Sequence, residues 1–423
     1  MSHASGRLRK GVVAATAVGM LVVPAVGGSA VALPPVAGTA VSATETPSAS
    51  PTPSPSPSGN DVVALTPFVQ RRLDSAVKRV MQQAHVPGVT VGIWTPDKGQ
   101  YVQSFGVADK RTAEPMYPDL YMRIGSETKT FTVTALLELV DSGKVSLDDT
   151  IGQYVSGVPN GDRITLRELA GMRSGLFNYS EDNDFYKALT SDPQRSFTPH
   201  QLLDYAFRHP VEFPPGAKFS YSNTNLILLG LVVEQASGQP IADYIQQNVL
   251  RPAGLRHTLF PNGNEFPTPH AQGYTEQTAT GKVENAADWN PSWAWAAGAM
   301  ISDLEDLRVW ARSVATGELP GGGHLISPAT QKQRLTTPAT PIPGVGYGLG
   351  IFNVQGWIGH NGSLPGYESL TVYLPSAQAT LVVLLNTDVN YKGTEPSTIF
   401  GQAITRIISP NHIFNLPAVP AAR

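Results

Sequence analysis

The chain has 423 residues, of which 41% are hydrophobic and 15% charged, and its formal net charge is -3 at pH 7. This length suffices for one large domain or two ordinary ones with a sizeable core, and the small net charge gives no indication of nucleic-acid binding. Cysteine is absent, which excludes disulfides, thiolate metal sites and cysteine nucleophiles.

Residues 1–32 have the pattern of a secretory signal peptide. Three basic residues come first, residues 11–28 are apolar, and Ala-Val-Ala at 30–32 offers a cleavage site. Because the apolar run nearly reaches spanning length, an uncleaved N-terminal anchor is the alternative. We expect a secreted, cell-wall-associated protein, or a membrane-anchored one if the segment is retained. Cleavage would leave 27 basic and 33 acidic residues, a net charge of -6.

Residues 33–60 are low in complexity and end in prolines that alternate with Ser and Thr. Such a composition has nothing to bury, so we expect a disordered, extended stalk that adds about 3.1 Å per residue. The stalk suits work in a cell wall, or it is a passive remnant of export. From residue 61 to residue 423 the composition is that of one globular domain.

The globular part predicts strands near both ends of the chain and helices in the middle. In chain order we expect a helix at 68–85, hairpin strands at 89–93 and 100–102, a helix from Ser126 to a Gly143 C-cap, mainly helices and loops at 146–290, strands at 347–353, 369–374 and 379–386, and a helix at 396–408. The two ends therefore build one sheet, the middle is a helical insertion beside it, and the cleft between them is the expected place for a site.

Ser126 and Lys129 lie three residues apart at the start of an apolar helical pattern. Residues i and i+3 of a helix share a face, so the hydroxyl and the amine can meet. A partly desolvated lysine can lose its charge and accept the serine proton. The pair predicts covalent acyl transfer through a serine ester, although Ser-x-x-Lys alone also occurs by chance.

Two later segments carry polar residues that could assist acyl transfer at Ser126. Tyr221 and Asn223 precede an apolar helix, where a phenol can shuttle a proton and an amide can hold a substrate amide; alternatively Tyr221 is a packed aromatic beside a helix cap. His360 and Asn361 stand between glycines in an apolar strand, where a free N–H could pair with that of Ser126 as an oxyanion hole; alternatively they form an exposed turn.

In this order, Ser-x-x-Lys at 126, Tyr-x-Asn at 221 and His-x-Gly at 360 resemble the three motifs of the serine penicillin-recognising enzymes. The histidine form is similar to the branch of class C β-lactamases and secreted actinomycete D-alanyl-D-alanine carboxypeptidases. The resemblance covers nearly all of residues 61–423. It implies an α/β (α+β) domain of the β-lactamase/transpeptidase type, with an antiparallel sheet from both chain ends flanked by helices, plus a mostly helical inserted subdomain.

The resemblance also implies roles for particular residues. Ser126 would be the nucleophile, Lys129 its base, and Tyr221 the proton carrier to the leaving group. The residues implied in substrate binding and the oxyanion hole are Asn223, Trp293, His360, Asn361, Gly362 and Ser363.

One departure concerns the substrate carboxylate. Relatives that cleave after binding a free C-terminal carboxylate often place an arginine just after the Gly-Tyr-Gly-Leu-Gly strand, whereas Ile351 and Phe352 follow here. Only His360, Asn361 and Ser363 remain near that position. This puts strict carboxypeptidase activity in doubt and leaves room for esters and D-amino amides.

We expect a secreted serine hydrolase that forms an acyl-enzyme at Ser126, foremost a penicillin-binding D-alanyl-D-alanine carboxypeptidase acting on peptidoglycan stem peptides. A broad-specificity esterase or a class C-like β-lactamase is the alternative, and a non-catalytic wall-binding module is a third. We expect no metal and no cofactor, since the histidines form no metal pair and no phosphate-binding loop is present. We also expect a monomer without nucleic-acid partners.

Overall fold

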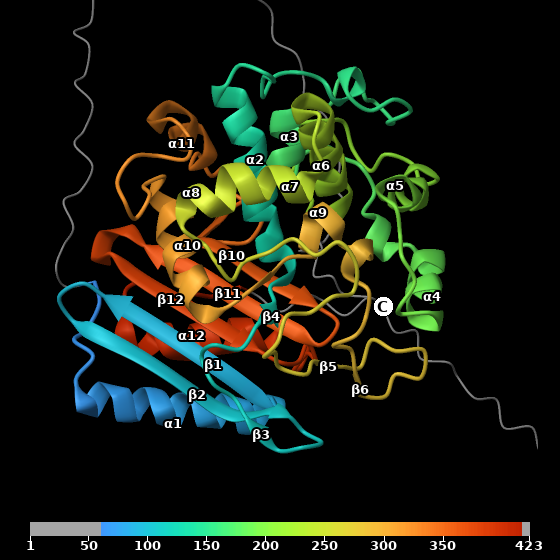
Figure 1. Ribbon diagram of the computed structural model, residues 1–423. Coiled ribbons are helices and arrows are strands. Elements are labelled where there is room, and N and C mark those ends of the chain that lie inside the picture. Colours follow the sequence, from blue (N-terminus) through green and yellow to red (C-terminus); the bar gives the residue numbers. More distant parts are fainter. Residues whose placement is uncertain (1–60, 417–423) are drawn as a thin grey trace, which may run out of the picture.

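The structure is a computed structural model that describes residues 61–416 (Figure 1). The expected signal segment and stalk lie outside these residues. Between residues 61 and 416, no helix is both long and apolar enough to cross a membrane.

One eight-stranded antiparallel sheet combines the two ends of the chain (Figure 1). Its order is β3-β2-β1-β12-β11-β10-β9-β8, and β1 from the N-terminal part pairs directly with β12 from the C-terminal part, Val91 opposite Val383. The strands are β1 (Gly88–Thr95), β2 (Gly99–Asp109), β3 (Glu114–Pro115), β8 (Val345–Tyr347), β9 (Phe352–Val354), β10 (Trp357–Leu364), β11 (Tyr367–Leu374) and β12 (Ala379–Leu385). The prediction that both ends build one sheet is confirmed.

Helices cover both faces of this sheet. The N-terminal helix α1 (Pro67–Ala84) and the C-terminal helix α12 (Pro396–Ile408) pack together on one face, while α2 (Thr128–Asp141) and α10 (Leu304–Thr316) lie on the other (Figure 1). Helix α1 turns an apolar stripe of Leu73, Val77 and Val80 inward. Both predicted terminal helices are confirmed.

The middle of the chain is the predicted region of helices and loops. It contains α3 (Leu166–Ala170), α4 (Asn183–Ser191), α5 (Pro199–Phe207), α6 (Asn223–Ser237), α7 (Ile241–Ile245), α8 (Arg251–Ala253) and a small hairpin of β5 (Tyr274–Thr275) and β6 (Glu284–Asn285); α9 (Trp295–Gly298) follows just beyond the predicted region of 146–290. Helix α6 is buried on all sides along its first half, as expected for a sequence that is apolar all round. Other short elements include β4 (Met122–Arg123), β7 (Ile301–Ser302) and α11 (Pro328–Arg334).

The single strand expected at 347–353 is wrong: the structure has two strands, β8 and β9, joined by a tight turn. Gly350 has φ +65° in this turn, and a Cβ there would lie 2.6 Å from Cγ2 of Val133 on α2. Glycine therefore permits both the left-handed backbone and the close approach of α2. The next strand, β10, carries His360, which is buried and does not lie in an exposed turn.

Candidate active site

Ser126 and Lys129 meet where the chain enters α2. Ser126 lies in a short 3-10 turn, η1 (Gly125–Glu127), that runs directly into α2, and residues three apart in such a turn lie one above the other. The Lys129 Nζ is 2.8 Å from the Ser126 Oγ and donates to the Ala297 carbonyl oxygen at 2.7 Å. The predicted contact between hydroxyl and amine is therefore present.

The Lys129 amine is fully buried. It forms no ion pair with any residue from 61 to 416, and burial lowers the pKa of Lys129 well below its usual 10.5. A neutral amine keeps one lone pair while still donating to Ala297. The lowered pKa thus favours the neutral amine, which can accept the Ser126 proton.

Tyr221 lies beside the Ser126 and Lys129 pair. Its ring centroid is 5.0 Å from the Lys129 Nζ, and its pKa is raised by burial, an effect that the adjacent Ser126 hydroxyl partly offsets. The phenol therefore stays protonated. It can pass a proton onward, but it is a poor resting base compared with the neutral lysine.

His360 is held neutral in an aromatic pocket. Its Nδ1 donates to the Asn361 carbonyl oxygen at 2.5 Å, so Nε2 is the acceptor toward the Tyr347 hydroxyl at 3.4 Å. Phe352 packs 4.8 Å from the His360 ring and Tyr221 lies 6.2 Å away. Burial, together with the Lys129 amine, lowers the pKa of His360 to about 3. The third motif therefore carries no positive charge at neutral pH.

Asn223 is positioned by a loop that the sequence analysis did not single out. Its backbone N–H donates to the Asn178 Oδ1 at 3.0 Å, which caps α6, and its Nδ2 donates to the Ser180 hydroxyl at 3.1 Å. The Asn223 Oδ1 makes no hydrogen bond within the described part of the chain, so it is available to a substrate N–H. Asn178 and Ser180 give no periodic signal, which is why sequence reasoning missed them.

Two glycines bring the Ser126 turn against β10. Gly125 has φ +51°, and a Cβ there would lie 2.6 Å from the Ser363 backbone nitrogen. A Cβ on Gly362 would overlap the carbonyl oxygen of Ile124. This close packing places the Ser363 N–H beside the Ser126 turn, the arrangement that an oxyanion hole requires.

Two other sequence-predicted binding residues are engaged elsewhere. The Asn361 amide donates to the Glu395 carboxylate at 2.7 Å, just before α12. Trp293 lies in a short 3-10 turn (Pro291–Trp293), is 3% exposed and packs against Phe185. Its carbonyl oxygen accepts from the Tyr179 hydroxyl at 2.6 Å. The Trp293 side chain therefore packs in the protein interior and offers little surface to a substrate.

A buried carboxyl next to the nucleophile was also missed. Glu127 is 1% exposed, and burial raises its pKa to about 8, although the hydroxyls of Ser369 and Thr371 lie close enough to lower it slightly. Neither carboxyl oxygen makes a hydrogen bond of good geometry within residues 61–416. Glu127 is therefore protonated at neutral pH and adds no negative charge beside Ser126.

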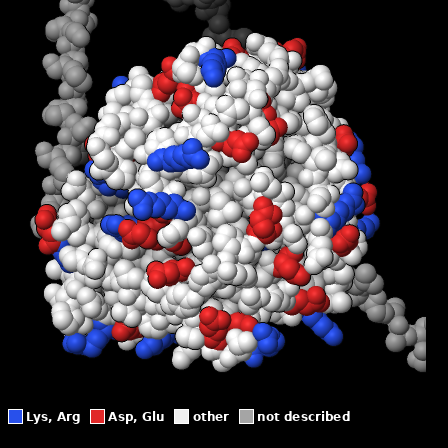
Figure 2. All heavy atoms as spheres, viewed as in Figure 1, with Lys and Arg blue, Asp and Glu red and all other residues white. Residues whose placement is uncertain are grey.

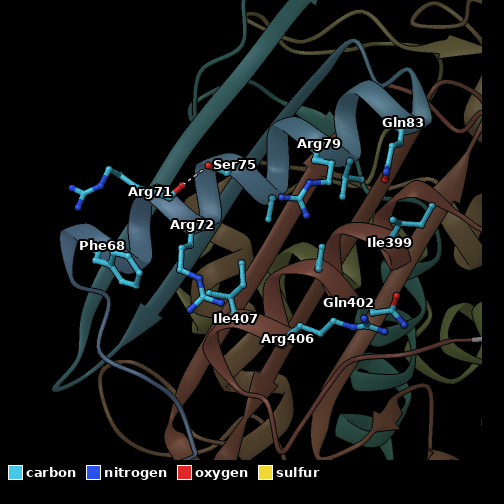
Figure 3. A pocket seen from close by; sticks show the side chains of 13 residues that line it. Phe68, Arg71, Arg72, Ser75, Arg79, Gln83, Ile399, Gln402, Arg406 and Ile407 are labelled. Carbon is cyan, nitrogen blue, oxygen red and sulfur yellow. Dashed lines mark hydrogen bonds between the residues drawn. The ribbon is translucent and has the colours of Figure 1, made fainter.

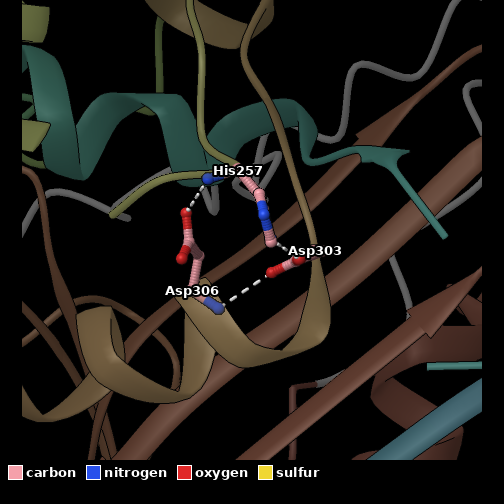
Figure 4. A group of neighbouring side chains, drawn as sticks. All are labelled: His257, Asp303 and Asp306. Atoms are coloured by element: carbon pink, nitrogen blue, oxygen red, sulfur yellow. Dashed lines mark hydrogen bonds and ion pairs between the residues drawn. The ribbon is translucent and has the colours of Figure 1, made fainter. Parts of the chain in front are cut away.

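A second cluster, away from Ser126, joins His257, Asp303 and Asp306 (Figure 4). Their potential ligand atoms lie within 4.8 Å of one another. Asp303 caps α10 and contacts the His257 Nδ1 at 2.6 Å, while Asp306 accepts from the His257 N–H at 2.7 Å. These hydrogen bonds attach the 255–258 loop to the N-terminus of α10, and this structural role explains why the three side chains lie together.

The fold, together with the contact between Ser126 and Lys129, is that of a serine hydrolase on a β-lactamase-like scaffold. The family profile described as "Beta-lactamase" matches residues 73–400. The chain belongs to this family, which places it among the serine β-lactamase and penicillin-binding hydrolases.

Three relatives show how the similarity is distributed. "Protein flp" of Staphylococcus aureus is 27% identical over 335 residues, covering 77% of this chain, which spans only 65% of the length of that relative. The "Putative penicillin-binding protein PbpX" of Bacillus subtilis is 25% identical over 69% of this chain and 68% of its own. The crystal structure of a D-stereospecific amidohydrolase from a Streptomyces species is 28% identical, with a TM-score of 0.69 over 80% of this chain and 97% of its own.

Proposed function

We propose that this protein hydrolyses amide bonds that follow D-amino acid residues, through an acyl-enzyme on Ser126. The observation that carries the proposal is the buried Lys129 amine, 2.8 Å from the Ser126 hydroxyl, whose pKa burial lowers well below its usual value. A serine with such a neighbour is an activated nucleophile. The similar Streptomyces amidohydrolase, described as D-stereospecific, supports the choice of amide and configuration.

The reaction uses the site residues in sequence. The Ser126 Oγ attacks the substrate carbonyl carbon while its proton passes to the Lys129 Nζ, and the backbone N–H groups of Ser126 and Ser363 hold the oxyanion. The proton then moves through the Tyr221 hydroxyl to the leaving nitrogen as the C–N bond breaks. Water later attacks the ester and returns a proton to Ser126. Asn223 holds the acyl-side amide throughout.

The charge of the site favours a leaving group without a free carboxylate. His360 is neutral because Phe352 and the surrounding aromatic rings desolvate it, and Asn361 is engaged by Glu395. Of the three residues expected near a substrate carboxylate, only Ser363 remains. We therefore place D-amino acid amides and C-terminally blocked D-peptides ahead of peptides that end in a carboxylate.

D-Ala-D-Ala carboxypeptidase activity on stem peptides is the second candidate. Three motifs in the family order favour it, as does the similarity to the putative penicillin-binding protein PbpX. An esterase or a β-lactamase would use the same acylation steps and differ in the leaving group and in the rate at which water clears the acyl-enzyme.

The test compares two substrates that differ only in terminal charge. We expect diacetyl-L-Lys-D-Ala-D-Ala amide to be cleaved with a kcat/KM at least tenfold above that of the free acid, and the L-Ala diastereomer of the amide to be inert. Ser126→Ala is the blank. A preference for the free acid would instead favour D-Ala-D-Ala carboxypeptidase activity. Rapid turnover of nitrocefin or a short-chain p-nitrophenyl ester, with both peptides untouched, would favour the β-lactamase or the esterase.

We further propose that the protein acts outside the cell. The support is the basic and apolar pattern of residues 1–32 and the Pro/Ser/Thr-rich composition of residues 33–60. Intact mass of protein from the culture medium tests cleavage after Ala32. Recovery of the uncleaved chain in the membrane fraction would favour the anchor.

A further inference from the structure

A groove runs between α1 and α12, on the sheet face that lies opposite α2 and α10 (Figures 1 and 3). Its volume is about 640 Å³. Side chains of Phe68, Arg72 and Arg79 from α1 face Arg406 and Ile407 from α12 (Figure 3). The groove is thus formed by the first and last helices of the domain and is separated from Ser126 by the sheet.

Its lining contains four arginines and no carboxylate: Arg71, Arg72, Arg79 and Arg406. All four are exposed, and none forms an ion pair with any residue between 61 and 416. The two helices carry five basic residues and one acid, Asp74, whose Oδ1 accepts from the Tyr101 hydroxyl at 2.9 Å. In a chain of net charge -3, this concentration of unpaired cations marks an anion-binding surface.

The rest of the surface shows no such concentration on the face in view. Figure 2 shows acidic and basic side chains interspersed over large uncharged areas, with Lys and Arg recurring along the lower edge, where α1 runs in Figure 1. The four arginines of the groove, without an acid beside them in its lining, therefore differ from the mixed charges of the face in Figure 2.

We propose that this groove binds a linear polyol phosphate polymer, in which phosphodiester groups alternate with short polyol units and no bases are present. Guanidinium groups match phosphate oxygens in paired hydrogen bonds. Arg72 and Arg79 are seven residues apart, which is about 10.5 Å along a helix, so they engage separate charges of one chain. Arg406 supplies a third contact from the opposite wall.

Two other occupants fit less well. A bilayer surface calls for several exposed apolar side chains, but Phe68 and Val283 are the only large ones exposed within the described residues, and only Phe68 lines the groove. The segments outside the described residues, 1–60 and 417–423, contain a single acid, Glu45. The ends of the chain therefore lack the charge to neutralise four arginines.

Binding here would hold the enzyme on a polyanionic matrix while Ser126, on the other side of the sheet, stays open to substrate. Polymer binding at the groove is independent of which substrate reacts at Ser126. Because each phosphate contact releases counterions, the affinity must fall steeply with salt.

The probe is fluorescently labelled poly(glycerol phosphate), with binding followed by anisotropy at 50 and 200 mM NaCl. We expect Arg72→Glu/Arg79→Glu to weaken binding at least tenfold at 50 mM. The matched control is Lys282→Glu/Lys332→Glu, which changes the net charge equally at two exposed lysines outside the groove; it should weaken binding less than twofold. Acylation of Ser126 should be unchanged in both. If the glutamate variant melts early, Arg72→Gln/Arg79→Gln replaces it.

Four results would overturn the proposal. They are no binding of the polymer by the wild type, equal losses in the groove and control variants, equal affinity for polyglutamate of the same length, and tighter arginine-dependent binding to phosphatidylglycerol vesicles. The last would assign the groove to a membrane.

Discussion

At the scale of single residues, the site depends on removing charge from groups that usually carry it. Burial lowers the pKa of Lys129 well below its usual value and that of His360 to about 3, and it raises the pKa of Glu127, in the Ser126 turn, to about 8. Each shift has the sign that desolvation imposes. The Ser126 hydroxyl therefore lies among groups whose uncharged forms are favoured, and in the proposed mechanism its proton passes to Lys129.

Lys129→Met tests that route. The thioether fills similar apolar space without a base, so we expect kcat/KM to fall by about 10²–10⁴. In the wild type, kcat/KM should rise with pH through the lowered pKa of the lysine, because only the neutral amine accepts a proton. This acidic limb should be missing from the residual activity of the variant. An unchanged pH profile would assign the base to another group, with circular dichroism as the control for folding.

The Tyr221→Phe substitution should reduce activity on amides far more than activity on esters. An amide nitrogen must be protonated before it departs, whereas p-nitrophenolate leaves unaided, so the loss of the phenol should cost the amide reaction about 10²-fold or more and the ester reaction far less. Ratios of kcat/KM for the two substrates measure this. Equal losses for both would show that Tyr221 only supports the shape of the site.

The candidate site residues were predictable because Ser-x-x-Lys, Tyr-x-Asn and His-x-Gly follow one another in the sequence in the order that a known family has. Ser126, Lys129, Tyr221 and His360 do come together in the structure. Asn178 was not predictable, since its contact with Asn223 depends on how a loop without periodicity folds over α6. The binding roles of the remaining motif residues stay predictions.

At the scale of elements, the decisive contact is that of the Ser126 turn with β10. Gly125 and Gly362 let two backbones approach more closely than any side chain would allow. The sequence showed the glycines but not what they face. The single strand expected at 347–353 was wrong for the same reason. Alternating glycines are compatible with one continuous strand and with two strands that turn back at Gly350, so the sequence did not distinguish the two.

Gly125→Ala tests this contact against a matched control. Gly143 also has positive φ, at +72°, but a Cβ there would have open space. Gly143→Ala should cost only the left-handed backbone strain, about 1 kcal/mol. Gly125→Ala adds a clash with Ser363 and should cost about 1–3 kcal/mol more, with at least a tenfold lower rate of acylation. Denaturant unfolding and acylation kinetics give both numbers. Equal behaviour of the two variants would refute the close approach.

At the scale of the whole molecule, buried acids set the dependence of stability on pH. Burial raises the pKa of Glu127 to about 8, that of Glu395 to about 7 and that of Asp388 to about 6, and it raises that of Glu368 as well. A carboxyl with a raised pKa stabilises the folded state fully below its unfolded pKa. That contribution is lost as the pH rises through the folded value.

Lys129 and His360 act in the opposite direction, because their lowered pKa values make the unfolded chain bind more protons. The contribution of His360 is complete above its unfolded pKa, near 6.5. Between pH 6.5 and 8, the loss from Glu127, Glu368 and Glu395 is therefore opposed only by Lys129 among these groups. We expect stability to decline over this interval.

Glu127→Gln isolates one part of that decline, since an amide fills the same space and does not ionise. Relative to this variant, the wild type should lose up to about 1.4 kcal/mol of unfolding free energy per pH unit between pH 4.5 and 8. Urea unfolding at pH 5.0, 6.5 and 8.0 measures the gap, and Glu114→Gln, on the exposed strand β3, should track the wild type. If the curves of wild type and Glu127→Gln run parallel, Glu127 ionises in the folded state as it does in water. The site would then carry a negative charge beside Ser126.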